Sequence, residues 1–131
     1  MKMVNPMDVK ANGHYTPGVL AGGMLYVSGQ LPMDPSTGMV AGKDAAEQVM
    51  RALYNLDKVL MAAGLSRDAV VSTHVYISDI ADWDKVNEAY SQFFGGHKPA
   101  RVIVPAGRLH HGALVEVEAI AEARSSSLTV D

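Results

Sequence analysis

Residues Val115-Glu116-Val117-Glu118-Ala119-Ile120-Ala121 alternate between small apolar and mostly polar side chains. Successive side chains of a β-strand point to opposite faces of the sheet, so this stretch predicts a strand within about residues 114–123. One face of the strand is apolar and joins a hydrophobic core; it carries Val115, Val117, Ala119 and Ala121. Glu116 and Glu118 point the other way, so the second face presents two carboxylates.

Earlier segments predict four further strands and two helices. Residues 18–30 predict two short strands joined by a Gly22-Gly23 turn, because glycine adopts positive φ without strain. Two more strands are predicted at residues 70–77 and at about 101–104. Residues 31–43 are rich in turn-forming residues and predict an exposed loop.

The first helix is predicted to begin at Asp44-Ala45-Ala46-Glu47, which has the form of a capping box, and to end at Gly64. Its polar face, which includes Asn55, is expected to be solvated. A second helix is expected from about Asp82 to Gly95-Gly96. The order β-β-α-β-α-β-β predicts an α+β fold, with two helices packed on one face of a mixed sheet.

Length and composition restrict the classes of protein. The 131 residues, 48% of them hydrophobic, predict a single domain over 1–131. A formal charge of -3 makes a nucleic-acid partner improbable, and no apolar run approaches the roughly 20 residues that span a membrane. The expectation is a cytoplasmic protein with small-molecule or protein partners.

The sheet face without helices still carries apolar residues, which must be buried by another surface. Self-association is the simplest way to bury them. The sequence therefore predicts an oligomer with polar groups at its subunit boundaries.

Arg101 is the one charged residue between Pro99 and Pro105. Its guanidinium stays charged, and removing it from water without an anionic partner is unfavourable. Two partners satisfy it: the carboxylate of a small acidic substrate, or Glu116 or Glu118 on a neighbouring strand. Internal ion pairs are the more common of the two arrangements.

The remaining candidates do not predict a metal or a covalent nucleophile. The chain has no cysteine, and its five histidines lack the spacing of a metal site; His110 and His111 would point to opposite sides of a strand. Tyr15 and Ser28 could join Arg101 and Glu116 in a hydrolysis without covalent catalysis. Alternatively, Tyr15 anchors a loop and Ser28 satisfies a backbone group. In the same alternative, Asn87 is an exposed helix residue.

Several segments, in this order and spacing, resemble the RidA/YjgF/UK114 family of imine deaminases. They are Val27-Ser28-Gly29-Gln30-Leu31-Pro32, 34–38, Asn55 with Ala63-Gly64-Leu65, Val86-Asn87-Glu88-Ala89-Tyr90 with Phe93-Phe94, Pro99-Ala100-Arg101 and 115–121. The resemblance implies a homotrimer of chorismate-mutase-like subunits with three clefts between them.

The resemblance also implies an activity, the hydrolysis of 2-imino or enamino acids such as 2-aminoacrylate to 2-keto acids and ammonia, without a cofactor. It assigns the substrate carboxylate to Arg101, and the positioning of water to Glu116 and the backbone carbonyl of Ile103. Tyr15, Ser28, Gly29 and Asn87 fall on positions that line the family's cleft.

Two departures from the family leave the substrate open. Ile103 replaces a common cysteine, which is expected to change pocket size and polarity. The loop around His110-His111 differs from the Leu-Pro sequence common in the family, although Leu109 is retained, so that either histidine could face the cleft. One alternative is a deaminase for an aminomuconate-type or aminoacrylate-type intermediate. Another is a ligand-binding or regulatory trimer, or a holdase-like protein, in a family also linked to RNA cleavage and translation inhibition.

Overall fold

The computed structural model describes residues 1–7, 11 and 13–123. Six strands form one sheet in the order β1-β2-β3-β8-β6-β7, and β4 and β5 form a separate hairpin. The strands are β1 (Lys2–Val4), β2 (Gly18–Ala21), β3 (Met24–Gln30), β4 (Met33–Asp34), β5 (Met39–Val40), β6 (Val70–Ile77), β7 (Ala100–Pro105) and β8 (Val115–Glu122). Only β6 and β7 pair in parallel, so the sheet is mixed as predicted.

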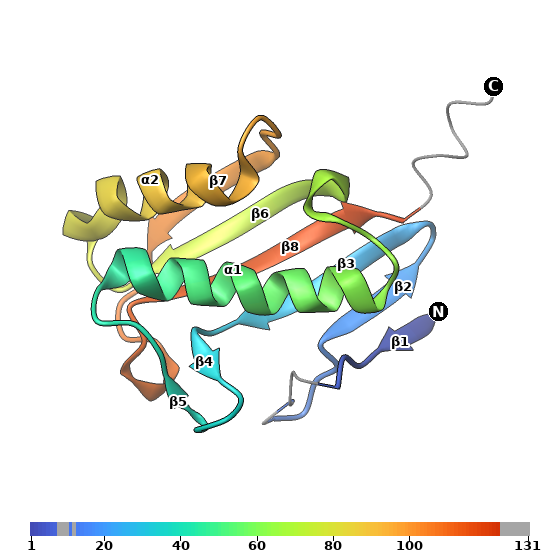
Figure 1. The fold of residues 1–131 in the computed structure, drawn as a ribbon, viewed down its shortest axis with the longest axis horizontal. Helices are drawn as coiled ribbons and strands as arrows, with labels where there is room; N and C mark the ends of the chain where they lie inside the picture. The colour runs from blue at the N-terminus through green and yellow to red at the C-terminus, as the bar shows by residue number, and fades with distance from the viewer. Residues whose placement is uncertain (8–10, 12, 124–131) are drawn as a thin grey trace.

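Two helices, α1 (Ala45–Ala62) and α2 (Trp83–Phe94), lie side by side on the same face of the sheet (Figure 1). Short 3-10 helices η1 (Arg67–Ala69), η2 (Ile80–Asp82) and η3 (His110–Gly112) lie in the connections. The predicted α+β architecture is confirmed. The sequence pattern missed β1 and the β4–β5 hairpin, because strands of two or three residues are too short to show alternation.

The start of α1 follows the predicted capping pattern with one change. Asp44 Oδ1 accepts a hydrogen bond from the Glu47 backbone N–H at 2.9 Å. Glu47 Oε1 in turn accepts from the backbone N–H of Lys43 at 3.0 Å, one residue before the expected donor. Both bonds satisfy donors that lie near the first turn and hold the preceding loop against the helix.

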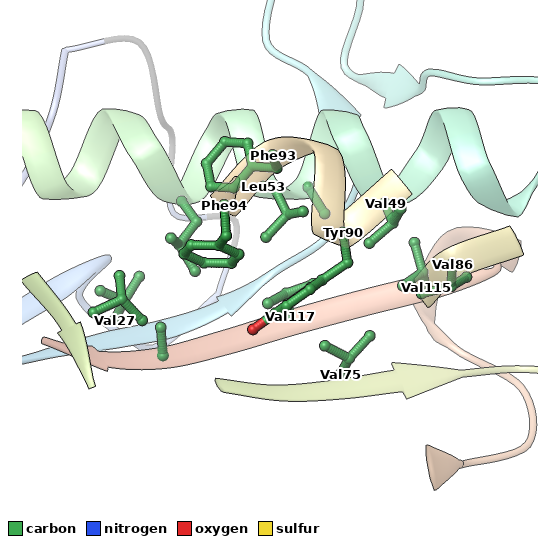
Figure 2. Packing of buried hydrophobic residues seen from close by; sticks show 14 of the residues in the cluster. Val27, Val49, Leu53, Val75, Val86, Tyr90, Phe93, Phe94, Val115 and Val117 are labelled. Carbon is green, nitrogen blue, oxygen red and sulfur yellow. The ribbon is translucent and has the colours of Figure 1, made fainter. Parts of the chain in front are cut away.

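The core lies between the two helices and the sheet. Val49 and Leu53 of α1 and Tyr90, Phe93 and Phe94 of α2 form one buried cluster with Val115 and Val117 of β8 (Figure 2). Both valines are fully buried, so the alternation of residues 115–121 predicts the core-facing side correctly. The Tyr90 hydroxyl points toward the sheet and lies 2.7 Å from Thr73 Oγ1 (Figure 2).

The opposite face of the sheet has no helix over it within the described ranges. Tyr26 is 47% exposed there, and Val102 and Val104 of the edge strand β7 are 45% and 38% exposed. These apolar side chains share their face with Glu116 and Glu118, since paired residues of adjacent strands point to the same side. No helix of the described segments is long and apolar enough to cross a bilayer.

Candidate functional site

Arg101 and Glu116 lie on opposite faces of the sheet. Arg101 pairs with Thr73 in the β6–β7 register, and the Thr73 hydroxyl contacts Tyr90 of α2, so this is the helix-covered face. Glu116 pairs with Tyr76, three positions further along β6, on the uncovered face. Within a single chain, the thickness of the sheet therefore separates Arg101 from Glu116.

The expectation of an internal ion pair for Arg101 is wrong for the part of the chain that is described. Strand β6 lies between β7 and β8, so Glu116 and Glu118 are not on a strand adjacent to Arg101. No described carboxylate forms a salt bridge with this guanidinium. Among the described residues, the charge of Arg101 is thus not neutralised by a carboxylate.

Side chains of α2 hold the guanidinium in place. Arg101 Nη1 donates a hydrogen bond of 2.8 Å to Asn87 Oδ1. The guanidinium carbon lies 4.9 Å from the centroid of the Tyr90 ring and 5.6 Å from that of Trp83. These contacts orient the arginine without neutralising it and use one of its five donors. Asn87 is half-buried and positions the guanidinium, so its interpretation as an exposed helix residue is wrong.

A cavity of about 400 Å³ opens beside this arginine. Asn87, Tyr90, His97, Lys98 and Arg101 contribute to its wall, and no acidic residue does. A site with this composition favours an anionic ligand.

A larger cavity, of about 640 Å³, lies on the uncovered side. Four predicted residues share its wall, namely Tyr15, Ser28, Gly29 and Glu116. The structure thus divides the predicted set into two groups: these four on one cavity, and Arg101 with Asn87 on the other.

A β-bulge shapes the Ser28–Gly29 segment. Val27 pairs with Ala119 and Gln30 with Val117, so β3 carries one extra residue at this point. A Cβ on Gly29 would clash with the Glu116 carboxylate, which is why the close approach requires glycine. Ser28 Oγ donates to the Thr16 carbonyl at 2.5 Å, so this hydroxyl does satisfy a backbone group, and the bond ties the Tyr15 segment to the bulge.

Glu116 is a half-buried carboxylate with a raised pKa. Burial raises the pKa of Glu116, the negative charge of Glu118 acts in the same direction, and the positive charge of His110 opposes them. Among the described residues, no donor forms a hydrogen bond with the Glu116 carboxylate. Glu118 is held by the Tyr76 hydroxyl, and this bond raises the pKa of Tyr76. Glu116 is the carboxylate left for a ligand.

His110 and His111 do not point to opposite sides, because they lie in η3 and not in a strand. Both line the larger cavity, and their ring centroids are 3.9 Å apart. His111 has a left-handed backbone with φ 62, which departs from the extended strand conformation and explains the difference. In the described parts of the chain, no three His, Cys, Asp or Glu residues are grouped to hold a metal.

Ile103 is a buried residue of β7. Its side chain is buried in the core and lines neither cavity, contrary to the expectation that it changes pocket size and polarity. The Ala106 N–H donates to the Ile77 carbonyl of β6 at 2.8 Å. Backbone groups alternate sides along a strand, so the Ile103 carbonyl points from the free edge of β7, where it can accept a hydrogen bond.

The sequence interpretation missed the role of Asn55. This residue is 5% exposed and lines the larger cavity, although the helical pattern placed it on the solvated face. Asn55 Nδ2 donates to the carbonyls of Leu31 at 3.0 Å and Met33 at 2.9 Å. The loop after the bulge covers this part of α1, which helical periodicity alone does not indicate; the resemblance, which includes Asn55, was the available signal.

The fold and the two cavities define a small α+β protein with one cavity lined by the basic residues His97, Lys98 and Arg101 and another that carries the carboxylates Glu116 and Glu118. The family model Endoribonuclease L-PSP matches residues 6–123. The chain belongs to this family, also known as the YjgF/RidA family, which confirms the resemblance.

Named relatives cover most of the chain. RutC family protein SSO3206 of Saccharolobus solfataricus is 46% identical over 86% of this chain and 90% of its own length. The 2-iminobutanoate/2-iminopropanoate deaminase of Rattus norvegicus is 43% identical over 85% of this chain and 81% of its own. The crystal structure of E. coli TdcF with bound serine superposes with a TM-score of 0.88 at 36% identity, covering 93% of this chain and 98% of that one.

Proposed function

We propose that this protein hydrolyses 2-imino and enamino acids to 2-keto acids and ammonia, at sites shared between the subunits of a homotrimer. The observation that carries the proposal is the complementary pair of unsatisfied groups: Arg101 has no carboxylate partner and Glu116 no hydrogen-bond donor among the described residues. An imino acid beside a water molecule supplies both missing partners. The rat relative at 43% identity is named as such a deaminase.

Two subunits are needed because one chain cannot present both groups to one small molecule. The carboxylate and the imine carbon of a 2-imino acid are directly bonded, whereas Arg101 and Glu116 lie on opposite faces of the sheet. Arg101 of one subunit must therefore approach the Glu116 cavity of the next. The exposed apolar residues on the uncovered face favour that association.

In the proposed site, Arg101 binds the substrate carboxylate through two parallel hydrogen bonds, and Asn87 holds the guanidinium in position. The Gly29 amide and Ser28 border the substrate. Glu116 and the Ile103 carbonyl orient a water molecule toward the imine carbon. That carbon is already electrophilic, so positioning supplies much of the rate enhancement, and the raised pKa of Glu116 makes it a better proton acceptor.

The size of the larger cavity favours a second candidate within the same chemistry. About 640 Å³ is more than a three- or four-carbon imino acid needs, so a longer unsaturated substrate of the aminomuconate type is also tested. A ligand-binding or regulatory trimer remains the non-catalytic alternative. The formal charge of -3 does not favour avid RNA binding.

The test generates imines in place with an amino-acid oxidase and follows their capture by semicarbazide, across a panel of amino acids. Wild-type protein should lower semicarbazone formation, and Arg101→Ala should lose roughly one to three decades of activity while remaining folded. Arg108→Ala removes an exposed arginine that lines neither cavity and serves as the matched control. A folded Arg101→Ala protein with wild-type turnover would contradict the proposed carboxylate site.

Native mass spectrometry tests the assembly. We expect a trimer at micromolar concentration. A stable monomer with full activity would contradict a site shared between subunits.

A further inference from the structure

His110 lies where a second proton-transfer group would be useful. It shares the larger cavity with Glu116, and the positive charge of His110 acts on that carboxylate. Other titratable groups on the same wall are Glu118 of β8, Asp34 of β4, Tyr15 and His111. Asp34 is paired with Arg51, and Glu118 with Tyr76, which leaves Glu116 as the uncommitted carboxylate facing the histidines.

The backbone of η3 adopts an unfavourable conformation at His111. His111 has φ 62 and is the single non-glycine residue with positive φ in the described ranges. A left-handed conformation is unfavourable for a side chain with a Cβ, and such positions are retained where the surroundings enforce them. Here the reversal brings two consecutive imidazoles to one cavity wall, with their rings 3.9 Å apart.

The loop is also anchored on both sides. After η3, Ala113 is 2% exposed, and the Leu114 backbone N–H donates to Gln48 Oε1 of α1 at 2.8 Å. Segment η3 also contacts β5 of the small hairpin, and Figure 1 shows this hairpin at the end of the sheet where β8 begins. The histidines therefore stand on a fixed support, as a reacting group requires.

Hydrolysis of an iminium ion needs proton transfers at two different atoms. Water oxygen bonds to the imine carbon, the C=N electron pair moves to nitrogen, and the water gives up a proton. The amino nitrogen must then gain a proton before the C–N bond breaks, with its electron pair leaving on ammonia. The remaining hydroxyl loses its proton as the C=O bond forms. The sum is iminium plus water to ketone plus ammonium.

We propose that His110 donates the proton to the departing nitrogen and takes back the hydroxyl proton, while Glu116 accepts the proton of the attacking water and passes it to ammonia. This inference rests on the proposed deaminase function and adds a residue to it. Imidazole suits the role because it can both give and accept a proton between about pH 5 and 8. With His110 in this role, Glu116 does not have to exchange protons with both the attacking water and the bound amino nitrogen.

The experiment compares His110→Gln with His14→Gln, both measured as kcat and kcat/KM from pH 5.5 to 9. His14 is exposed and lines neither cavity, so its variant should keep wild-type values. His110→Gln should lower kcat at pH 7 by about 10- to 100-fold and remove one limb of the pH profile. Imidazole added to His110→Ala should restore part of kcat and should leave Glu116→Gln unchanged.

Each outcome separates this inference from the function on which it rests. A His110→Gln protein with wild-type kcat and an unchanged pH profile would overturn the role of His110, while the loss of activity in Arg101→Ala still supported the deaminase. A drop in kcat without imidazole rescue and with the wild-type profile would show a structural effect and also overturn it. Wild-type protein inactive on every imine would overturn both.

Discussion

A shared site makes two inactive variants active when they assemble together. Arg101→Ala removes the carboxylate-binding group, and Glu116→Gln removes the group that orients water. Because these residues lie on opposite faces of one sheet, each proposed site takes Arg101 from one subunit and Glu116 from the next. A mixed trimer therefore contains some sites in which both groups are intact.

The expected recovery follows from cyclic symmetry. At equal mixing, the subunit that supplies arginine has it intact in half of the sites, and the subunit that supplies glutamate has it intact in half. About one quarter of the sites are then of wild-type composition, and activity should return to about one quarter of the wild-type value. If both groups acted within one chain, the mixture would stay inactive.

The assay is semicarbazone formation on variants that are co-expressed at equal levels, with all trimers retained and with tags of different mass so that native mass spectrometry can weigh the composition. Wild type mixed equally with the double variant Arg101→Ala/Glu116→Gln is the control. A shared site predicts about one quarter of full activity for this mixture, and a site within one chain predicts about one half. Mixed trimers of the single variants that show no recovery would refute the division of the site between subunits.

Three further variants test single interactions. Burial raises the pKa of Glu116, so the native state holds this proton more tightly than the unfolded chain, and ionisation costs stability above its ordinary pKa of 4.5. Glu116→Gln should therefore raise Tm at pH 7, and the gain should disappear as the pH falls below 4.5; a lower Tm at pH 7 would contradict this. Asn87→Asp should give Arg101 an internal anionic partner and raise KM about 10-fold with little change in kcat, whereas an unchanged KM would show that the guanidinium is not free for substrate. Ile103→Cys should keep deaminase activity and shift the ranking of substrates by at most about 1 to 3 kcal/mol, because the side chain lies in the core; activity that appears only after cysteine is introduced would indicate a binding protein.

The main elements of the fold were predictable because their patterns are local. The alternation of residues 115–121 and the helical spacing from Val49 onward each reflect one face against the core, and both hold in the structure. The Gly22-Gly23 turn was predictable from the glycine pair, since both residues have positive φ. Strand order and pairing are not local, which is why Glu116 was expected beside Arg101 when β6 separates their strands.

The site was less accessible from residue patterns. Periodicity assigned Asn55 to the solvated side of α1, because the covering loop is not part of the helix's own repeat. The positions of His110 and His111 depend on one left-handed residue, which the sequence does not signal, since histidine rarely adopts it. The resemblance to a family supplied Tyr15, Ser28, Gly29 and Glu116 of one cavity and Asn87 and Arg101 of the other, but their separation into two cavities is visible only in three dimensions.

The division of the site links assembly to chemistry. The uncovered face carries exposed Tyr26, Val102 and Val104, and it also carries Glu116. Burial of apolar surface at about 25 cal/mol per Å² favours association, and the proposed contact brings a neighbouring Arg101 to the carboxylate. The same contact would lower the effective dielectric around both charges, which strengthens their interactions with a substrate. Activity should consequently fall faster than protein concentration on dilution below the dissociation constant of the proposed trimer, because a separated subunit has no complete site.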